Sequence, residues 1–129
     1  MREDRFVGEP LAKVARVLDT EEVCWPGPYV KQALTELASA NRVILGFDIL
    51  DFATEPPTDW DTSGYEMGFD LVDLSWEECV KVSLEKALAW AERTMDPRFK
   101  PPFDDVWYCV TAVSPEDARS MGLHIKADS

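Results

Sequence analysis

Ten carboxylate side chains lie between Arg42 and Lys81, with no lysine or arginine among them. They are Asp48, Asp51, Glu55, Asp59, Asp61, Glu66, Asp70, Asp73, Glu77 and Glu78. Trp60, Tyr65 and Phe69 are interleaved with these acids. In protein interfaces aromatic rings supply rigid contact area, and carboxylates steer a basic partner and fix its register. A solvated acidic face is an equally good explanation for any single residue, but the window as a whole favours a binding surface.

Residues for other kinds of chemistry are sparse. The single histidine, His124, lies near the C-terminus, where a histidine is usually a surface residue. The chain has no P-loop, G-x-G-x-x-G, G-x-S-x-G or H-E-x-x-H motif. Its cysteines are dispersed, and Asp59-Trp60-Asp61 lacks the acidic spacing of an EF-hand, so neither zinc nor calcium is expected. The sequence predicts no cofactor, metal or catalytic residue, although abundant carboxylates leave an acid–base pair open.

Charge and composition limit the class of protein. The 129 residues fit one domain, and the net charge of −12 favours basic partners over nucleic acid or anionic membrane, unless it serves solubility alone. Cys24, Cys79 and Cys109 are odd in number and far apart, which favours a reducing compartment over a disulfide framework. The N-terminus lacks an apolar signal-peptide core, and no apolar run approaches the ~18 residues of a membrane span. These features predict a cytoplasmic protein.

The densest apolar run is RVILGFDILDF, from Arg42 to Phe52. Apolar residues occupy both alternations, which predicts a strand, Val43–Phe52, covered on both faces and central in its sheet. Gly46 predicts a bulge or a close approach by another element. Asp48 places a carboxylate in mid-strand, where it either bonds neighbouring backbone, pairs with Arg42, or points into a binding groove beside the proline-containing loop.

Two further strands and one long helix follow. Alternating residues predict a strand at Tyr65–Leu71, paired as a hairpin with the first strand after a long loop that could be functional. A second run, apolar on both alternations, predicts a strand at Val106–Val113. The clearest helix is Trp76–Met95, amphipathic throughout, with Ser75 and Glu78 forming a capping box.

Shorter elements complete the expected fold. One helix begins at Pro10 and could end near Asp19, and Val23–Trp25 is a short apolar step before a second helix. That second helix ends at Asn41 in a left-handed cap. A last short helix has Ser114 as its N-cap. Together these elements predict a single α+β domain, a small and mainly antiparallel sheet covered by two to three helices.

The motifs also resemble a known family. The runs WPGPYVKQALTEL, VILGFDIL, DWDTSGY and SWEECVKVSLEKALAW are similar to segments of the Imm series, bacterial immunity proteins of polymorphic toxin systems. The resemblance covers about Cys24 to Met95 and is strongest at Gly46 with Asp48, and at Ser75-Trp76-Glu77 with Ser83 and Lys86-Ala87. It departs from the family at Phe47, where a second glycine is expected, and at Cys79, where an aromatic is expected. It makes residues 1–129 one immunity-like domain, with 1–23 as an N-terminal extension.

The resemblance implies an antidote that performs no reaction and blocks a cognate, basic toxin domain, for which a nuclease is a fair candidate. The expected contact residues are Asp48, Asp51, Glu55, Asp59, Trp60, Asp61, Tyr65 and Glu66. Two alternatives stay open. A small enzyme would hold two carboxylates with divergent pKa values in a closed pocket, and a structural adaptor subunit would expose an apolar patch. The oligomeric state is left open.

Overall fold

The computed structural model describes residues 2–54, 58–66, 74–98, 101 and 104–120, and for residues 58–59 and 61–66 it describes the backbone alone. Five strands form one antiparallel sheet in the order β1-β2-β5-β3-β4. They are β1 (Arg16–Val17), β2 (Val23–Pro26), β3 (Val43–Asp51), β4 (Thr58–Glu66) and β5 (Val106–Val113). The predicted α+β class is confirmed.

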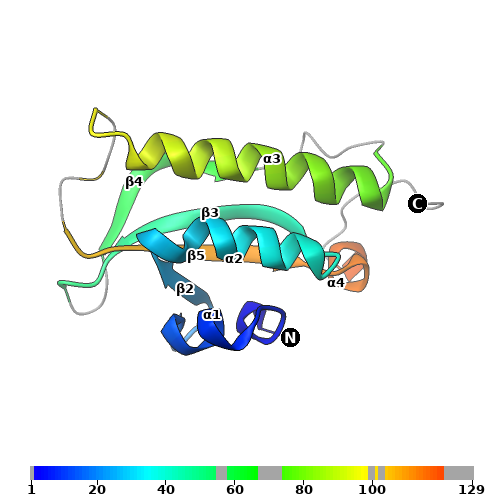
Figure 1. Ribbon diagram of the computed structural model, residues 1–129, viewed down its shortest axis with the longest axis horizontal. Coiled ribbons are helices and arrows are strands. Elements are labelled where there is room, and N and C mark those ends of the chain that lie inside the picture. Colours follow the sequence, from blue (N-terminus) through cyan, green and yellow to red (C-terminus); the bar gives the residue numbers. More distant parts are fainter. Residues whose placement is uncertain (1, 55–57, 67–73, 99–100, 102–103, 121–129) are drawn as a thin grey trace.

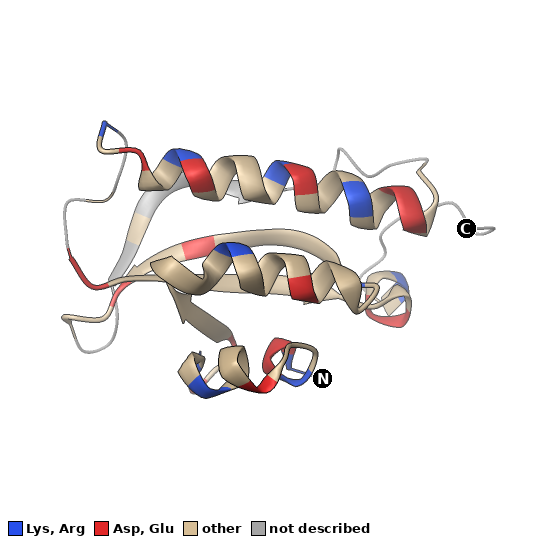
Figure 2. Cartoon of the chain, viewed as in Figure 1, with Lys and Arg blue, Asp and Glu red and all other residues tan. Residues whose placement is uncertain are grey.

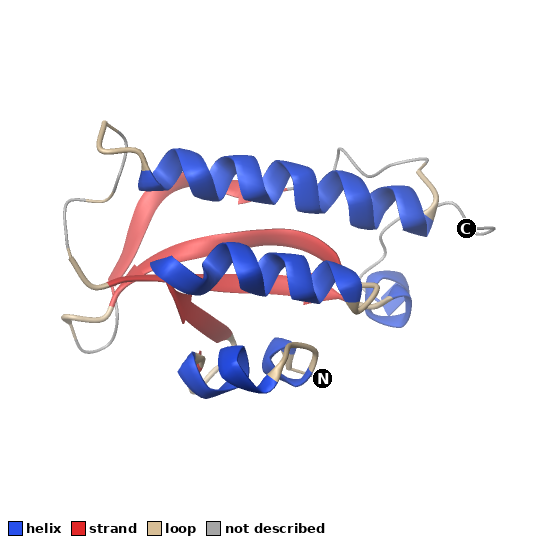
Figure 3. Ribbon diagram, viewed as in Figure 1, coloured by secondary structure: helices blue, strands red, loops and turns tan. Residues whose placement is uncertain are grey.

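The helices gather on one side of this sheet. Helices α2 (Gly27–Ser39) and α3 (Trp76–Met95) lie side by side over it, as Figures 1 and 3 show. The short α1 (Glu9–Val14), the 3₁₀ turn η1 (Glu3–Arg5) and α4 (Pro115–Ser120) pack at its margins. One core cluster, which includes Leu34, Phe47 and Ala87, fills the space between the sheet and the two long helices.

Local sequence signals place the helix ends correctly. The backbone N–H of Glu78 donates to Ser75 Oγ at 3.2 Å, and the Ser75 hydroxyl contacts Glu78 Oε1 at 3.0 Å, so the predicted cap of α3 is confirmed. Ser114 caps α4 by accepting from the N–H of Asp117 at 3.1 Å. Asn41 follows α2 with φ of 64°, the left-handed conformation predicted for it.

The predicted central strand is confirmed as β3, which pairs with β5 on one side and β4 on the other. The register with β5 shifts between Ile44 and Gly46, which confirms the predicted bulge. At this shift the N–H of Ile44 donates to Ser83 Oγ on α3 at 3.0 Å. The irregular strand therefore keeps its buried donor satisfied through the helix above it.

The prediction for β4 is wrong in position. We expected a strand at Tyr65–Leu71 after a long loop, but β4 runs over Thr58–Glu66 and contains most of that loop; residues 67–71 lie outside the described part. Ile49 pairs with Trp60 while Phe47 pairs with Tyr65, so β4 has residues 61–64 where β3 has only Asp48. The Ser63-Gly64 turn signal thus belongs to a bulge within a strand, because pairing with β3 overrides the local preference.

The first helix also differs from its prediction. Helix α1 ends at Val14, not near Asp19, because the chain becomes extended at Ala15 and Arg16–Val17 pairs with β2. The predicted extension, residues 1–23, is integrated into the core in its described part. Leu11 is buried and its carbonyl accepts from Trp25 Nε1 at 3.0 Å.

The other side of the sheet has a separate, smaller cluster. Cys24, Leu50 and Cys109 are buried there, with Leu18, Phe52 and Trp107 packed against them. No residue of this cluster belongs to a helix in the described chain. We call this side, defined by these six residues, the open face. None of the described helices combines the length and the apolar character needed to cross a lipid bilayer.

Candidate functional site

A row of four side chains crosses the open face from strand to strand. Arg16 on β1 is paired with Cys24 on β2, Cys24 with Cys109 on β5, and Cys109 with Asp48 on β3. Residues paired directly across strands lie on the same face of a sheet. The two thiols are buried, whereas Arg16 and Asp48 are exposed, so the row carries opposite charges at its two ends.

The guanidinium of Arg16, at one end of this row, stacks with two aromatic rings. The Arg16 guanidinium carbon lies 4.6 Å from the centroid of the Phe52 ring and 4.7 Å from that of Trp107. The two rings are 4.9 Å apart, and Trp107 Nε1 donates to Asp105 Oδ1 at 2.7 Å. A cation over a ring contributes about 0.5–1 kcal/mol at exposed sites. The stack therefore holds two large, half-buried rings in fixed positions, which would lower the entropy cost of binding a partner there.

Carboxylates lie near the stack. Asp51 ends β3 opposite Val106, a residue on the helix side of the sheet, and its Oδ1 accepts from the N–H of Ala53 at 2.9 Å, which fixes the turn that carries Phe52. Asp105 precedes β5 and is exposed. Figure 2 shows an acidic position midway along β3, whereas α3 on the other side of the sheet carries charges of both signs. The stack thus has acidic neighbours on β3 and before β5.

The structure separates two residues that the sequence placed in one surface. Asp48 lies on the open face, opposite Cys109. Trp60 packs against the core cluster beneath the helices, on the other side of the sheet. Of the remaining predicted contacts, Glu55 lies outside the described residues, and only the backbone of Asp59, Asp61, Tyr65 and Glu66 is described, along β4 at the edge of the sheet.

Arg42, which the sequence offered as a possible partner of Asp48, has other contacts in the structure. Arg42 is buried, donates to the carbonyl of Ala112 at 3.0 Å and lies 3.8 Å from Asp117. Its guanidinium carbon is also 3.6 Å from the centroid of the Phe6 ring. Arg42 therefore links η1, β5 and α4, and Asp48 is left exposed on the open face.

Sequence reasoning missed Arg16, Phe52, Trp107 and Asp105. The strand at Val106–Val113 is apolar on both alternations, which indicated a second covered face but did not show what would cover it. Arg16 on β1 lies near Trp107 on β5 because β2 pairs with both strands. No local motif in the sequence encodes that relation.

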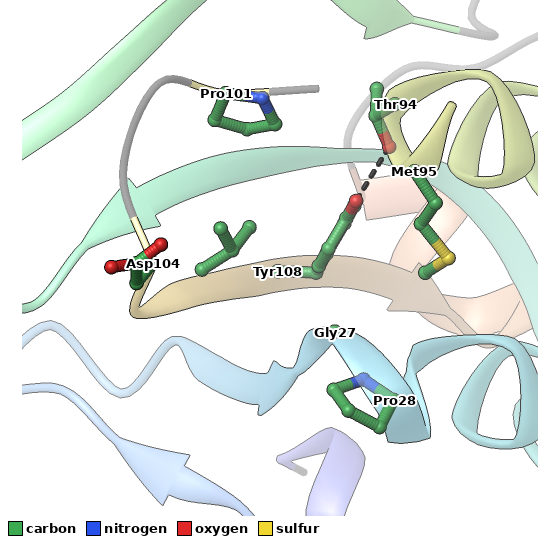
Figure 4. A pocket seen from close by; sticks show the side chains of 8 residues that line it. Gly27, Pro28, Thr94, Met95, Pro101, Asp104 and Tyr108 are labelled. Atoms are coloured by element: carbon green, nitrogen blue, oxygen red, sulfur yellow. Dashed lines mark hydrogen bonds between the residues drawn. The ribbon is translucent and has the colours of Figure 1, made fainter. Parts of the chain in front are cut away.

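A pocket lies on the helix side of the sheet, between the start of α2, the end of α3 and the start of β5 (Figure 4). Its volume is about 340 Å³, and its lining residues are Gly27, Pro28, Thr94, Met95, Pro101, Asp104, Val106 and Tyr108. Thr94 Oγ1 bonds the Ala91 carbonyl at 2.7 Å and the Tyr108 hydroxyl at 2.5 Å. Since the threonine proton goes to the carbonyl, Tyr108 is the donor to Thr94.

The pocket offers little for acid–base chemistry among the described residues. Asp104 is the single carboxylate in its described lining, and it is exposed. Burial raises the pKa of Tyr108 above its usual value, so the hydroxyl stays protonated at neutral pH. No group of three or more His, Cys, Asp or Glu suited to a metal ion occurs in the described part of the chain.

Comparisons with known proteins add no assignment. No protein-family model matches the chain, and no significant match is found among curated proteins or solved structures. The site therefore has to be interpreted from its own geometry, and the similarity to the Imm series stays a prediction.

Proposed function

We propose that this chain is a cytoplasmic immunity protein that binds a basic toxin domain and blocks it without performing a reaction. The observation that carries the proposal is the Arg16–Phe52–Trp107 stack on the open face, with the carboxylates of Asp48 and Asp105 on the same face. Pre-positioned aromatic rings within an acidic surface are suited to a partner with basic and apolar groups. The net charge of −12 supports the same kind of partner.

The charge also favours a class of toxin. Enzymes that attack nucleic acid need basic substrate grooves, and an acidic protein can occupy such a groove in place of the polyanion. A nuclease domain is therefore the first partner to test. The predicted contacts on β4, Asp59 and Asp61 among them, border β3 and would extend the surface from Asp48 across the edge of the sheet.

The two alternatives have less support from the described residues. A permanent adaptor needs an exposed apolar patch, but Tyr29 is the only large hydrophobic residue that is exposed in the described chain. A carboxylate-dependent enzyme needs two acids in one pocket, and the described pocket lining has Asp104 alone. We therefore place toxin binding first.

A protection assay tests the proposal. A toxin domain encoded beside this chain's gene is induced in a test bacterium, with or without the chain. Survival is expected with the wild type and is expected to fall with Asp48→Lys. The matched control, Glu85→Lys, makes the same change in net charge at an exposed position of α3.

Three results would separate the explanations. Loss of protection only in the open-face variant, with its circular dichroism unchanged, would support the surface as well as the function. Equal loss in both variants would mean that net charge alone matters and would reject the open face. Killing despite the wild-type chain, for each toxin domain encoded nearby, would reject the immunity proposal.

A further inference from the structure

Cys24 and Cys109 are directly opposite each other on neighbouring antiparallel strands, β2 and β5. Both are free thiols on the open face, and their exposed fractions are 0% and 3%. The third cysteine, Cys79, lies on α3 in a different core cluster, with Val43 and Val113. The fold thus brings together two of the three cysteines, although 84 residues separate them in the chain.

Strand pairing gives these two residues a separation that a disulfide can span. Directly opposite residues of antiparallel strands have Cα atoms about 4.5 or about 5.5 Å apart, depending on the type of pair. Disulfides span Cα separations of about 4.4–6.8 Å. Cβ atoms in a sheet pair are about 4.5–5.5 Å apart, and a disulfide needs about 3.5–4.5 Å. Closing the bond therefore draws β2 and β5 slightly together, and a strained disulfide is readily reduced again.

The surroundings hold the Cys109 sulfur in the thiol form. Cys109 Sγ donates to Glu22 Oε2 at 3.5 Å, and the other carboxylate oxygen of Glu22 accepts from Thr20 Oγ1 at 2.7 Å. The hydrogen bond with Cys24, burial and the negative charge of Glu22 together raise the pKa of Cys109 far above its usual value. Asp48 across β3 adds a second acid to this face.

Arg16 is the basic group that faces the pair, since it is paired with Cys24 across β1. Its guanidinium lies over Phe52 and Trp107 instead of over a sulfur. The bond with Cys24, burial and the Glu22 carboxylate therefore favour thiol over thiolate at Cys109, which slows its reaction at neutral pH.

We propose that Cys24 and Cys109 are a redox modification site, which a low-molecular-weight disulfide converts reversibly into a cross-strand disulfide. Cys109 loses its proton to solvent, and its thiolate attacks one sulfur of the small disulfide. The sulfur–sulfur bond of the oxidant breaks and releases one thiolate, leaving a mixed disulfide on Cys109. The deprotonated Cys24 sulfur then attacks the Cys109 sulfur and releases the second thiolate. The two protons from the protein end on two small thiols, and the oxidant is reduced by two electrons.

Cys109 is the sulfur reached first. It is bonded to Glu22, an exposed residue, whereas Cys24 has no exposed surface. The bridge would tie β2, which leads directly into α2, to the middle of β5. It lies between Arg16 and Asp48, so oxidation would also fix the row of side chains that crosses the open face. This inference does not depend on the proposed function.

The test uses the folded Cys79→Ser chain, which keeps only the proposed pair. It is incubated with oxidised glutathione at mildly alkaline pH, free thiols are alkylated, and intact mass and tryptic peptides are measured. The expected product is a monomer that has lost two hydrogens, with the peptide containing Cys24 linked to the peptide containing Cys109. Excess small thiol should restore both free cysteines. Each of three results would overturn the proposal. The first is a stable glutathione adduct on one cysteine, and the second is a disulfide-linked dimer. The third is two thiols that stay free in the native chain but react once the chain is unfolded in urea.

Two further variants keep the result specific. Cys24→Ser retains Cys79 and Cys109, and it should yield a glutathione adduct on Cys109 with no internal bridge. A Cys79–Cys109 bridge in that variant would show that chain flexibility, not strand register, sets the pairing. Glu22→Gln removes the carboxylate bonded to Cys109 and should form the bridge several-fold faster at pH 7 than Glu21→Gln, which makes the same charge change one residue away. Equal rates would exclude a role for Glu22 in holding the pair reduced.

Discussion

Asp48 and Trp60 lie on opposite faces of the sheet, one exposed beside Cys109 and the other packed beneath the helices. Trp60 is paired with Ile49, the residue that follows Asp48, so one step along β3 changes the face. Asp48 and Trp60, an acid and an aromatic of the acidic segment between Arg42 and Lys81, therefore have different structural roles. Asp48 is exposed on the open face, and Trp60 contributes to the core.

Trp60→Ala is expected to lower stability without acting on the open face. Because the ring is half-buried against the core, its loss should reduce the free energy of unfolding by about 2 kcal/mol. Urea unfolding followed by circular dichroism measures the change. Tyr29→Ala, at an exposed aromatic, is the control and should change stability by less than about 0.5 kcal/mol. Equal effects would mean that Trp60 is not a core residue.

Ser83→Ala should also destabilise the protein, although alanine is the better helix former. Ser83 is fully buried in α3, and its hydroxyl accepts the N–H of Ile44 where the register of β3 shifts. Removing the hydroxyl leaves a buried donor unpaired, which costs about 1–3 kcal/mol. Denaturant midpoints compare this variant with Glu85→Ala on the exposed side of the same helix. A stability equal to that of Glu85→Ala would show that Ile44 finds another acceptor.

Tyr108→Phe gives a prediction that depends on pH. Burial raises the pKa of Tyr108 in the folded chain, so the folded state keeps its proton at a pH where the unfolded chain, with a pKa of about 10, has lost it. The wild type should therefore lose stability as pH rises above about 10. At pH 8 the variant should be less stable by about 1 kcal/mol, because the hydrogen bond to Thr94 is missing.

Above pH 10 that difference should shrink, since phenylalanine has no proton to lose. Thermal unfolding at several pH values measures both chains, and Tyr29→Phe serves as the exposed control. A difference between wild type and Tyr108→Phe that stays constant through pH 11 would contradict a raised pKa for Tyr108.

Asp48→Lys should change how salt affects toxin binding. A carboxylate on an exposed strand face attracts a basic partner over distances that salt screens. Its reversal should slow association and flatten the dependence of the association rate on ionic strength, with less effect on dissociation. Stopped-flow association at low and physiological salt compares it with Glu85→Lys. A slope unchanged from that of the control would place Asp48 outside the interface.

The sequence by itself determined the elements whose signals are local. Strands β3 and β5, helix α3 and the caps at Ser75, Asn41 and Ser114 lie where periodicity and capping residues predicted them. Each of these signals depends on residues within one or two turns, or on alternation along one strand. The same local reasoning failed at Ser63-Gly64, because the pairing of β4 with β3 accommodates a bulge there.

Only the tertiary structure decided what meets on each face. Arg16 reaches Phe52 and Trp107, Cys24 meets Cys109, and Arg42 bonds Ala112 because strands distant in sequence pair in one particular register. A shift of one residue in any of those pairings would turn the side chains to the other face. Register depends on how the whole sheet packs against its helices, so sequence composition could indicate an acidic and aromatic surface but could not assign Asp48 to it and Trp60 to the core.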